Sequence, residues 1–141
     1  YMEHLEDNIR TFAPLEELNN EQKEFLFETA ELMLQYPTIP CNDCKYCMPC
    51  PYGLDIPAIL LHYNKCINEG NMVKTSRDEN YRKARRAFLV GYDRAVEKER
   101  QADHCVGCKQ CNHHCPQHID IPKEIRRIDE YIEKLKQGLE F

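Results

Sequence analysis

Eight of the nine cysteines lie in two short runs of four, and this arrangement restricts the possible folds and cofactors more than any other feature of the sequence. The first run, CNDCKYCMPCP, spans residues 41–51, and the second, CVGCKQCNHHCP, spans residues 105–116. Cysteines two or three residues apart on one loop point several sulfur atoms at one centre. Such spacing suits a metal better than the separate loop closures of a disulfide scaffold, which is the weaker interpretation. The runs therefore predict two metal centres.

Both runs belong to a longer repeat that ends in the pattern CPxxxDIP, at residues 50–57 and again at 115–122. The aspartate of this pattern suits a helix N-cap, and the proline that follows suits the first helical turn. The repeat therefore predicts two similar half-sites, each a cysteine loop that leads into a capped helix.

Helical patterns occupy most of the remaining sequence, and no strand pattern competes with them. We expect helices over residues 19–35, from Asp55 to Gly70, from Ser76 to Val96, and from Asp120 to Gly138. Predicted capping boxes join Asn19 to Gln22 and Ser76 to Glu79. The third and fourth helices carry apolar stripes formed by Tyr81, Ala84, Phe88, Leu89, Tyr92, Ala95 and Val96, and by Ile125, Ile128, Ile132 and Leu135. The predicted fold class is all-α, with two cysteine loops joined by helices.

Charge and hydropathy argue against two classes of partner. The formal net charge is −5 at pH 7, which argues against a protein that binds the phosphate backbone of nucleic acid. No stretch approaches the roughly 20 apolar residues that span a bilayer, and no secretory signal pattern opens the sequence. We therefore expect no membrane partner and a cytoplasmic location.

The spacing of the runs resembles the CxxCxxCxxxCP pattern of bacterial two-cluster ferredoxins. The second run matches it in full, whereas only Met48 and Pro49 separate Cys47 from Cys50 in the first. In that pattern three cysteines hold one [4Fe–4S] cluster and the fourth, before proline, holds the other. The resemblance implies one ligand set of Cys41, Cys44, Cys47 and Cys115, and a second of Cys105, Cys108, Cys111 and Cys50.

Zinc is the rival metal, since four cysteines also make a tetrahedral structural site. Four consecutive cysteines followed by proline favour iron–sulfur clusters over the separated CxxC pairs that zinc usually takes. The ninth cysteine, Cys66, lies at helical spacing among apolar residues and is interpreted as a buried thiol. The other polar candidates are His104, His113, His114 and His118, expected outside the ligand sets, and Arg82, Lys83, Arg85 and Arg86, expected on a solvated helix face or against an acidic partner.

The two runs, together with the stretch MEHLEDNIRTFAPL at residues 2–15, resemble the C-terminal iron–sulfur extension of bacterial aldo/keto reductase-like oxidoreductases. The chain begins with Tyr1 rather than methionine, and the resemblance implies that an N-terminal (β/α)₈ barrel precedes it and binds NAD(P)H. Residues 1–36 would then be a linker and helix after the barrel, and residues 37–141 the two-cluster domain. The resemblance implies an alpha-helical ferredoxin-like fold for that domain. The barrel would be this domain's partner within one parent chain.

Two functions follow from these expectations. The first is electron transfer through two [4Fe–4S] clusters within a larger oxidoreductase. The second is a structural metal module, of zinc or iron–sulfur, without a redox role. No nicotinamide fingerprint or acid–base constellation occurs among these residues, so we expect no catalytic residue in this fragment and no catalysis by it alone.

Overall fold

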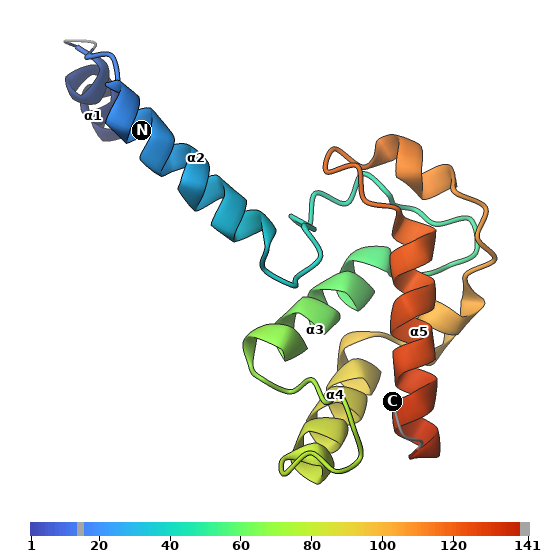
Figure 1. The fold of residues 1–141 in the computed structure, drawn as a ribbon. Coiled ribbons are helices and arrows are strands. Elements are labelled where there is room, and N and C mark those ends of the chain that lie inside the picture. Colours follow the sequence, from blue (N-terminus) through green and yellow to red (C-terminus); the bar gives the residue numbers. More distant parts are fainter. Residues whose placement is uncertain (14–15, 139–141) are drawn as a thin grey trace. The chain divides into compact units, whose positions relative to one another are not determined.

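The computed structural model describes residues 1–13 and 16–138, and it divides into two compact units, Tyr1–Tyr36 and Pro37–Phe141. The first unit holds helices α1 (Met2–Phe12) and α2 (Asn20–Leu34). The second holds α3 (Ile56–Asn68), α4 (Tyr81–Ala95), α5 (Ile121–Gln137) and the 3₁₀ helices η1 (Lys98–Arg100), η2 (Ala102–His104) and η3 (Gln110–His114) (Figure 1). The described residues contain no strand, which confirms the all-α prediction.

The first unit consists of two exposed helices. The predicted capping box begins α2: the backbone N–H of Gln22 donates to Asn19 Oδ1, and that of Asn19 donates to Gln22 Oε1, each at 2.9 Å. The helical pattern of α1 was not predicted from the sequence. Neither helix buries a residue, and large apolar side chains stay exposed on both, among them Leu5, Ile9, Phe12, Phe25, Phe27 and Leu34. Pro14 and Leu15, the end of the barrel-like stretch, lie outside the described residues.

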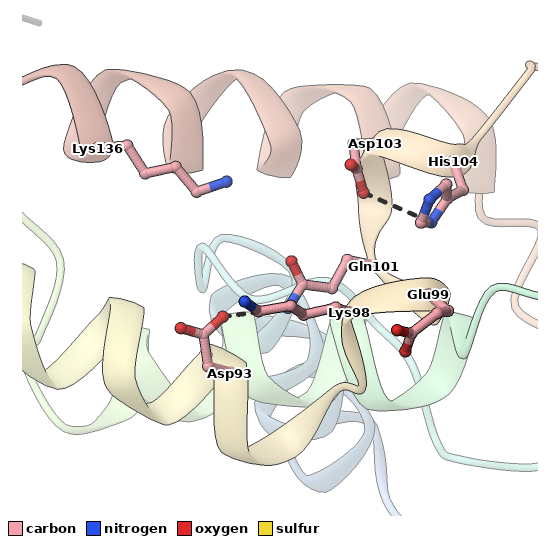
Figure 2. Close-up of a pocket in the computed structure, with 7 residues that line it drawn as sticks. All are labelled: Asp93, Lys98, Glu99, Gln101, Asp103, His104 and Lys136. Carbon is pink, nitrogen blue, oxygen red and sulfur yellow. Dashed lines mark hydrogen bonds and ion pairs between the residues drawn. The ribbon is translucent and has the colours of Figure 1, made fainter.

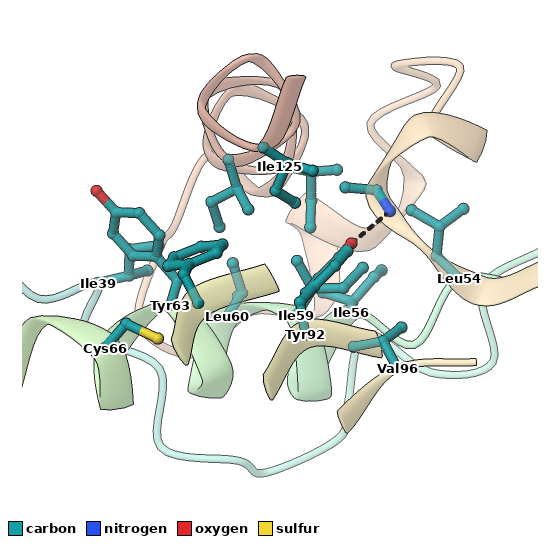
Figure 3. Close-up of a cluster of buried hydrophobic side chains, with 14 of the residues drawn as sticks. Ile39, Leu54, Ile56, Ile59, Leu60, Tyr63, Cys66, Tyr92, Val96 and Ile125 are labelled. Carbon is teal, nitrogen blue, oxygen red and sulfur yellow. Dashed lines mark hydrogen bonds between the residues drawn. The ribbon is translucent and has the colours of Figure 1, made fainter. Parts of the chain in front are cut away.

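Helices α3, α4 and α5 pack against one another around the core of the second unit (Figure 3). The predicted stripes are confirmed at their centres, because Phe88, Ile125 and Ile128 are 0% exposed. Phe88 contacts Tyr131 edge to face with 5.0 Å between ring centroids. Ala95, assigned to the stripe from sequence, is exposed. This core fixes the directions in which α3 and α5 present their N-termini.

Both repeat helices begin after the predicted aspartate, but only one aspartate acts as the N-cap. Asp55 Oδ1 accepts the backbone N–H of Ala58 at 3.3 Å, as expected. Asp120 makes no such bond. The side chain of Asn112 takes its place, because Asn112 Oδ1 accepts the N–H of Ile121 at 3.1 Å while Asn112 Nδ2 donates to Asp120.

The predicted start of the third helix at Ser76 is wrong, since α4 begins at Tyr81 with no side-chain cap. The carboxylate of Asp78 accepts the backbone N–H groups of Lys74 at 2.7 Å and Thr75 at 3.1 Å, and the Thr75 hydroxyl at 2.9 Å. An aspartate that binds nearby backbone in this way offers the chain a turn in place of a helix. These hydrogen bonds lower the pKa of Asp78, and the bond from the backbone N–H of Lys74 has the largest effect.

None of the described helices combines the length and the apolar character that a membrane span requires.

Candidate metal centres

The two cysteine runs lie on loops at the end of the second unit where α3 and α5 begin (Figure 1). Asn64 of α3 holds the entry to the first loop: its Oδ1 accepts the N–H of Ile39 at 2.8 Å and its Nδ2 donates to the Ile39 carbonyl at 2.7 Å. Arg100 ties the exit of that loop to the segment before the second run. Its carbonyl accepts the N–H of Asp55 at 3.1 Å, and its Nε donates to the Gly53 carbonyl at 3.2 Å.

The two loops repeat the same backbone conformation at matching positions. Aligning the runs on their cysteines pairs Asp43 with Gly107, Lys45 with Lys109, and Gly53 with His118. All six residues have positive φ, from 52° at His118 to 83° at Gly53. Left-handed residues next to right-handed ones make concave turns of backbone N–H groups, a conformation found at many iron–sulfur sites. The two loops thus share left-handed backbone at three matching positions, as expected of two similar half-sites.

The second centre is a cavity lined by four thiols. Cys105, Cys108 and Cys111 line it from the second run, and Cys50 lines it from the first. The enclosed part of the cavity has a volume of about 20 Å³. Its apolar wall includes Leu54, Ile56, Pro122 and Ile125. The structure therefore brings Cys50 to the other run's three cysteines.

The first centre gathers the remaining four. Burial is the largest cause that raises the pKa of Cys41. The negative charges of Asp43, Cys115 and Cys44 raise it further, whereas a backbone hydrogen bond lowers it. Burial and the charges of Cys41, Cys44 and Cys115 raise the pKa of Cys47 to about 11. The charge of Cys115 thus affects the thiols of the opposite run.

The two centres adjoin. Burial, then the charges of Cys105, Cys108 and Cys47, raise the pKa of Cys111 to about 11. Cys47 belongs to the first group and Cys111 to the second, so charge in one group is felt in the other. The eight thiols of the two runs thus form one assembly, in which charge on one group affects the other.

This donor set fits a cubane cluster. Four thiols line the walls of the second cavity, and apolar side chains lie behind them. Thiolate sulfur is also the usual ligand of [4Fe–4S] clusters.

The histidines beside the second run stay outside both groups. His104, His113, His114 and His118 are all exposed. Cys66 is buried at 2% exposure, with its Sγ 3.4 Å from Nε2 of His62, which confirms its interpretation as a core thiol.

Of the basic stretch on α4, Arg82, Lys83 and Arg86 are exposed, but Arg85 is not a simple surface charge. It donates to the carbonyls of Leu135 at 2.5 Å and Lys136 at 3.2 Å, and so caps the end of α5. Sequence reasoning also missed Asn64, Arg100 and Asn112, the residues that position the loops. Their partners lie up to 47 residues away, and no local pattern marks them.

A second, polar cavity lies beside η1, η2 and α5 and includes Asp93, Gln101, Asp103, His104 and Lys136 (Figure 2). Two pairs of its polar groups already contact one another, because Gln101 Nε2 donates to Asp93 Oδ1 at 3.1 Å and His104 Nδ1 lies 3.6 Å from Asp103 Oδ1. The cysteine assembly, not this cavity, gathers the reactive groups of the domain.

Thiol counting tests the assembly. If the eight clustered cysteines are the ligands, no cysteine should react rapidly with a thiol reagent in the loaded protein, because Cys66 is buried and burial raises its pKa to about 11. Chelation of iron under argon should expose the eight, with the solvent-exposed Cys108 labelled first. Mass spectrometry of the labelled peptides measures this order. Rapid labelling of Cys66 in the loaded protein would contradict it.

The metal-free domain should lose stability as the pH rises from 9 to 11. The folded pKa of Cys47 and Cys111 is about 11, above the unfolded value of about 8.5. The stability that this difference contributes is fully present below pH 8.5 and is lost as pH rises through the folded pKa. Thermal unfolding of the chelated protein at several pH values measures how stability changes with pH. The variant Cys47→Ser/Cys111→Ser should lose less stability over the same pH range. An equal loss of stability in both proteins would contradict the attribution of this pH dependence to Cys47 and Cys111.

Comparison with known proteins supports an iron–sulfur domain. The profile of the 4Fe-4S dicluster domain family matches residues 40–120, which include both cysteine runs and α3 and α4 between them. No curated protein and no solved structure matches the chain. The family match covers more than half of the sequence and all eight clustered cysteines. The chain therefore belongs to the 4Fe-4S dicluster domain family.

Proposed function

We propose that this domain transfers electrons through two [4Fe–4S] clusters, one held by Cys41, Cys44, Cys47 and Cys115 and the other by Cys105, Cys108, Cys111 and Cys50. The exchange of Cys50 and Cys115 between the runs carries the proposal. It joins the two centres through shared loops, so that they are neighbours. Each cluster, when bound, takes up and releases one electron at a time.

The surroundings of the centres support a redox role over a purely structural one. A purely structural metal centre needs only to hold loops together. Here Leu54, Ile56 and Ile125 exclude water from one side of the second centre, while Cys108 on the other side is exposed. Burial and solvent access are levers that set reduction potential. An exposed ligand also gives an outside donor or acceptor a short route to the centre.

We further propose that the domain serves an aldo/keto reductase-like barrel that binds NAD(P)H and precedes it in a longer cytoplasmic chain. The resemblance of residues 2–15 and of both cysteine runs supports this parent. So does the first unit, whose helices bury nothing and expose Leu5, Ile9 and Phe25, as expected of helices that cover another domain. A hydride carries two electrons, and two adjacent one-electron centres match that number.

Metal analysis of protein purified without oxygen tests the electron-transfer proposal. We expect about eight irons and eight acid-labile sulfides per chain, and a cubane signal in electron paramagnetic resonance after reduction. Stoichiometric zinc without sulfide would assign the chain to structural zinc modules. Full iron and sulfide without any reducible signal would leave only the structural role and reject electron transfer.

A further inference from the structure

We propose that the surface beside Cys108 docks an acidic electron-carrier protein, through a basic rim formed by Lys109, Lys123, Arg126 and Arg127. This inference rests on the proposed electron-transfer function and names the kind of partner that exchanges electrons with it.

The position of Cys108 is the first observation. Of the eight proposed ligands, Cys108 is the one whose side chain is exposed, while the other seven are partly buried. The second centre is therefore the one that a partner can approach most closely. A groove beside it shares Gly107, Lys109 and Pro122 with the wall of the cysteine cavity. A partner seated in this groove lies against the second centre.

The charge of the groove is the second observation. Its charged residues are Lys109, Lys123, Arg126 and Arg127, with Asp120 and Glu130. Arg127 is engaged by Glu124, and Asp120 accepts a hydrogen bond from Asn112. In the part of the chain that the structure describes, no ion pair joins Lys109, Lys123 or Arg126 to an acidic group. Three exposed cations thus line the groove beside the exposed ligand, in a chain whose net charge is −5.

The expected partner follows from this charge. Four thiolates make the loaded centre negative, so an acidic protein that approached it without help would be repelled. Cations around the point of approach offset that repulsion and raise the rate of encounter, as complementary rims do in transient complexes. Electron-transfer complexes bury little surface and depend on such steering. On docking, a reduced carrier would lose one electron and the second centre would gain it, with no bond made or broken.

The other exposed basic surface provides a matched control. Arg82, Lys83, Arg86 and Arg94 line a groove on α4, but no cysteine lines it. Removing two charges there changes the net charge by the same amount as removing two from the rim. Any effect confined to the rim then reports its place beside Cys108 and not the overall charge.

An acidic plant-type [2Fe–2S] ferredoxin is the probe. Its affinity for the cluster-loaded full chain is measured by calorimetry in the oxidised state, and its rate of electron delivery by anaerobic stopped flow. For Lys123→Gln/Arg126→Gln we expect roughly tenfold weaker binding and slower delivery at 50 mM salt, with the difference lost near 1 M. Arg82→Gln/Arg86→Gln should stay within about twofold of the unaltered protein. Iron content should be unchanged in both variants.

The outcomes separate the two proposals. Clusters that neither dithionite nor ferredoxin reduces would overturn electron transfer, and this inference with it. Clusters that dithionite reduces, combined with ferredoxin binding that is absent, insensitive to salt or equally weakened by both variants, would overturn the docking surface alone. Ferredoxin binding that is sensitive to salt and is weakened only by Lys123→Gln/Arg126→Gln would support the docking surface.

Discussion

Replacing Cys50 by alanine should remove the cluster of the second run and leave that of the first. Cys50 is part of the first run in sequence, but its side chain lines the cavity of Cys105, Cys108 and Cys111. Alanine offers no ligand atom, and a cubane held by three thiolates beside an exposed position is open to water. We expect iron to fall from about eight to about four per chain, as measured by metal analysis and electron paramagnetic resonance.

Double variants show which cluster is lost, because residues that hold one centre act as a unit. Cys50→Ala/Cys108→Ala should keep the same four irons as Cys50→Ala. Cys50→Ala/Cys44→Ala should keep none, since Cys44 lies in the other group. Cys44→Ser alone should lose the first cluster and loosen the packing of the loop beside it.

The residual spectra provide the control. Cys50→Ala and Cys105→Ala should leave the same spectrum, and Cys44→Ala a different one. If Cys50→Ala instead leaves the spectrum of Cys44→Ala, each run holds its own cluster and the exchange of ligands is wrong. Full iron content in Cys44→Ser would contradict the assignment of that residue.

The sequence predicted most of the fold because its signals are local. Asn19 and Gln22 form their capping box within four residues, and Gly138 ends α5 in the left-handed conformation that glycine adopts readily. The repeat CPxxxDIP likewise predicted two helices that begin at matching positions. Periodic apolar residues such as Ile125, Ile128 and Ile132 then identified the buried face of α5 without knowledge of its partners.

The sequence predictions of helix starts failed where two local signals compete. Ser76 and Glu79 have the spacing of a capping box, but Asp78 between them binds the backbone of Lys74 and Thr75 and holds a turn. At the second repeat, Asp120 has the sequence of an N-cap, yet Asn112 from the cysteine loop satisfies the helix end. An amide eight residues earlier in sequence is no signal until the loop has folded back.

The sequence marks the proposed cysteine ligands more clearly than the residues that position their loops. Eight cysteines stand out in any reading of the sequence. The bonds that position their loops join residues far apart, such as Asn64 with Ile39 and Arg100 with Gly53. The basic rim is likewise assembled from a loop lysine and from α5, so the neighbourhood of Lys109 and Arg126 is visible only in the fold.

Substituting Ile125 by alanine should both destabilise the domain and shorten the lifetime of the second cluster. Ile125 is 0% exposed, packs in the core and lines the cysteine cavity. Truncating such a side chain costs about 2–5 kcal/mol, or roughly 10–20 °C in the unfolding midpoint of a domain of this size. The lost wall also admits water to the sulfur ligands, so the visible absorbance of the bound cluster should decay faster in air.

Ile128→Ala is the matched control for this substitution. Ile128 lies on the same helix and is also 0% exposed, but it does not line the cavity. We expect a similar fall in the midpoint, measured by anaerobic thermal unfolding, with little change in cluster lifetime at a temperature well below both midpoints. Equal acceleration of cluster loss in the two variants would mean that lifetime follows global stability. Acceleration in Ile125→Ala alone means that the apolar wall shields the centre directly, which is the arrangement a reversible redox site requires.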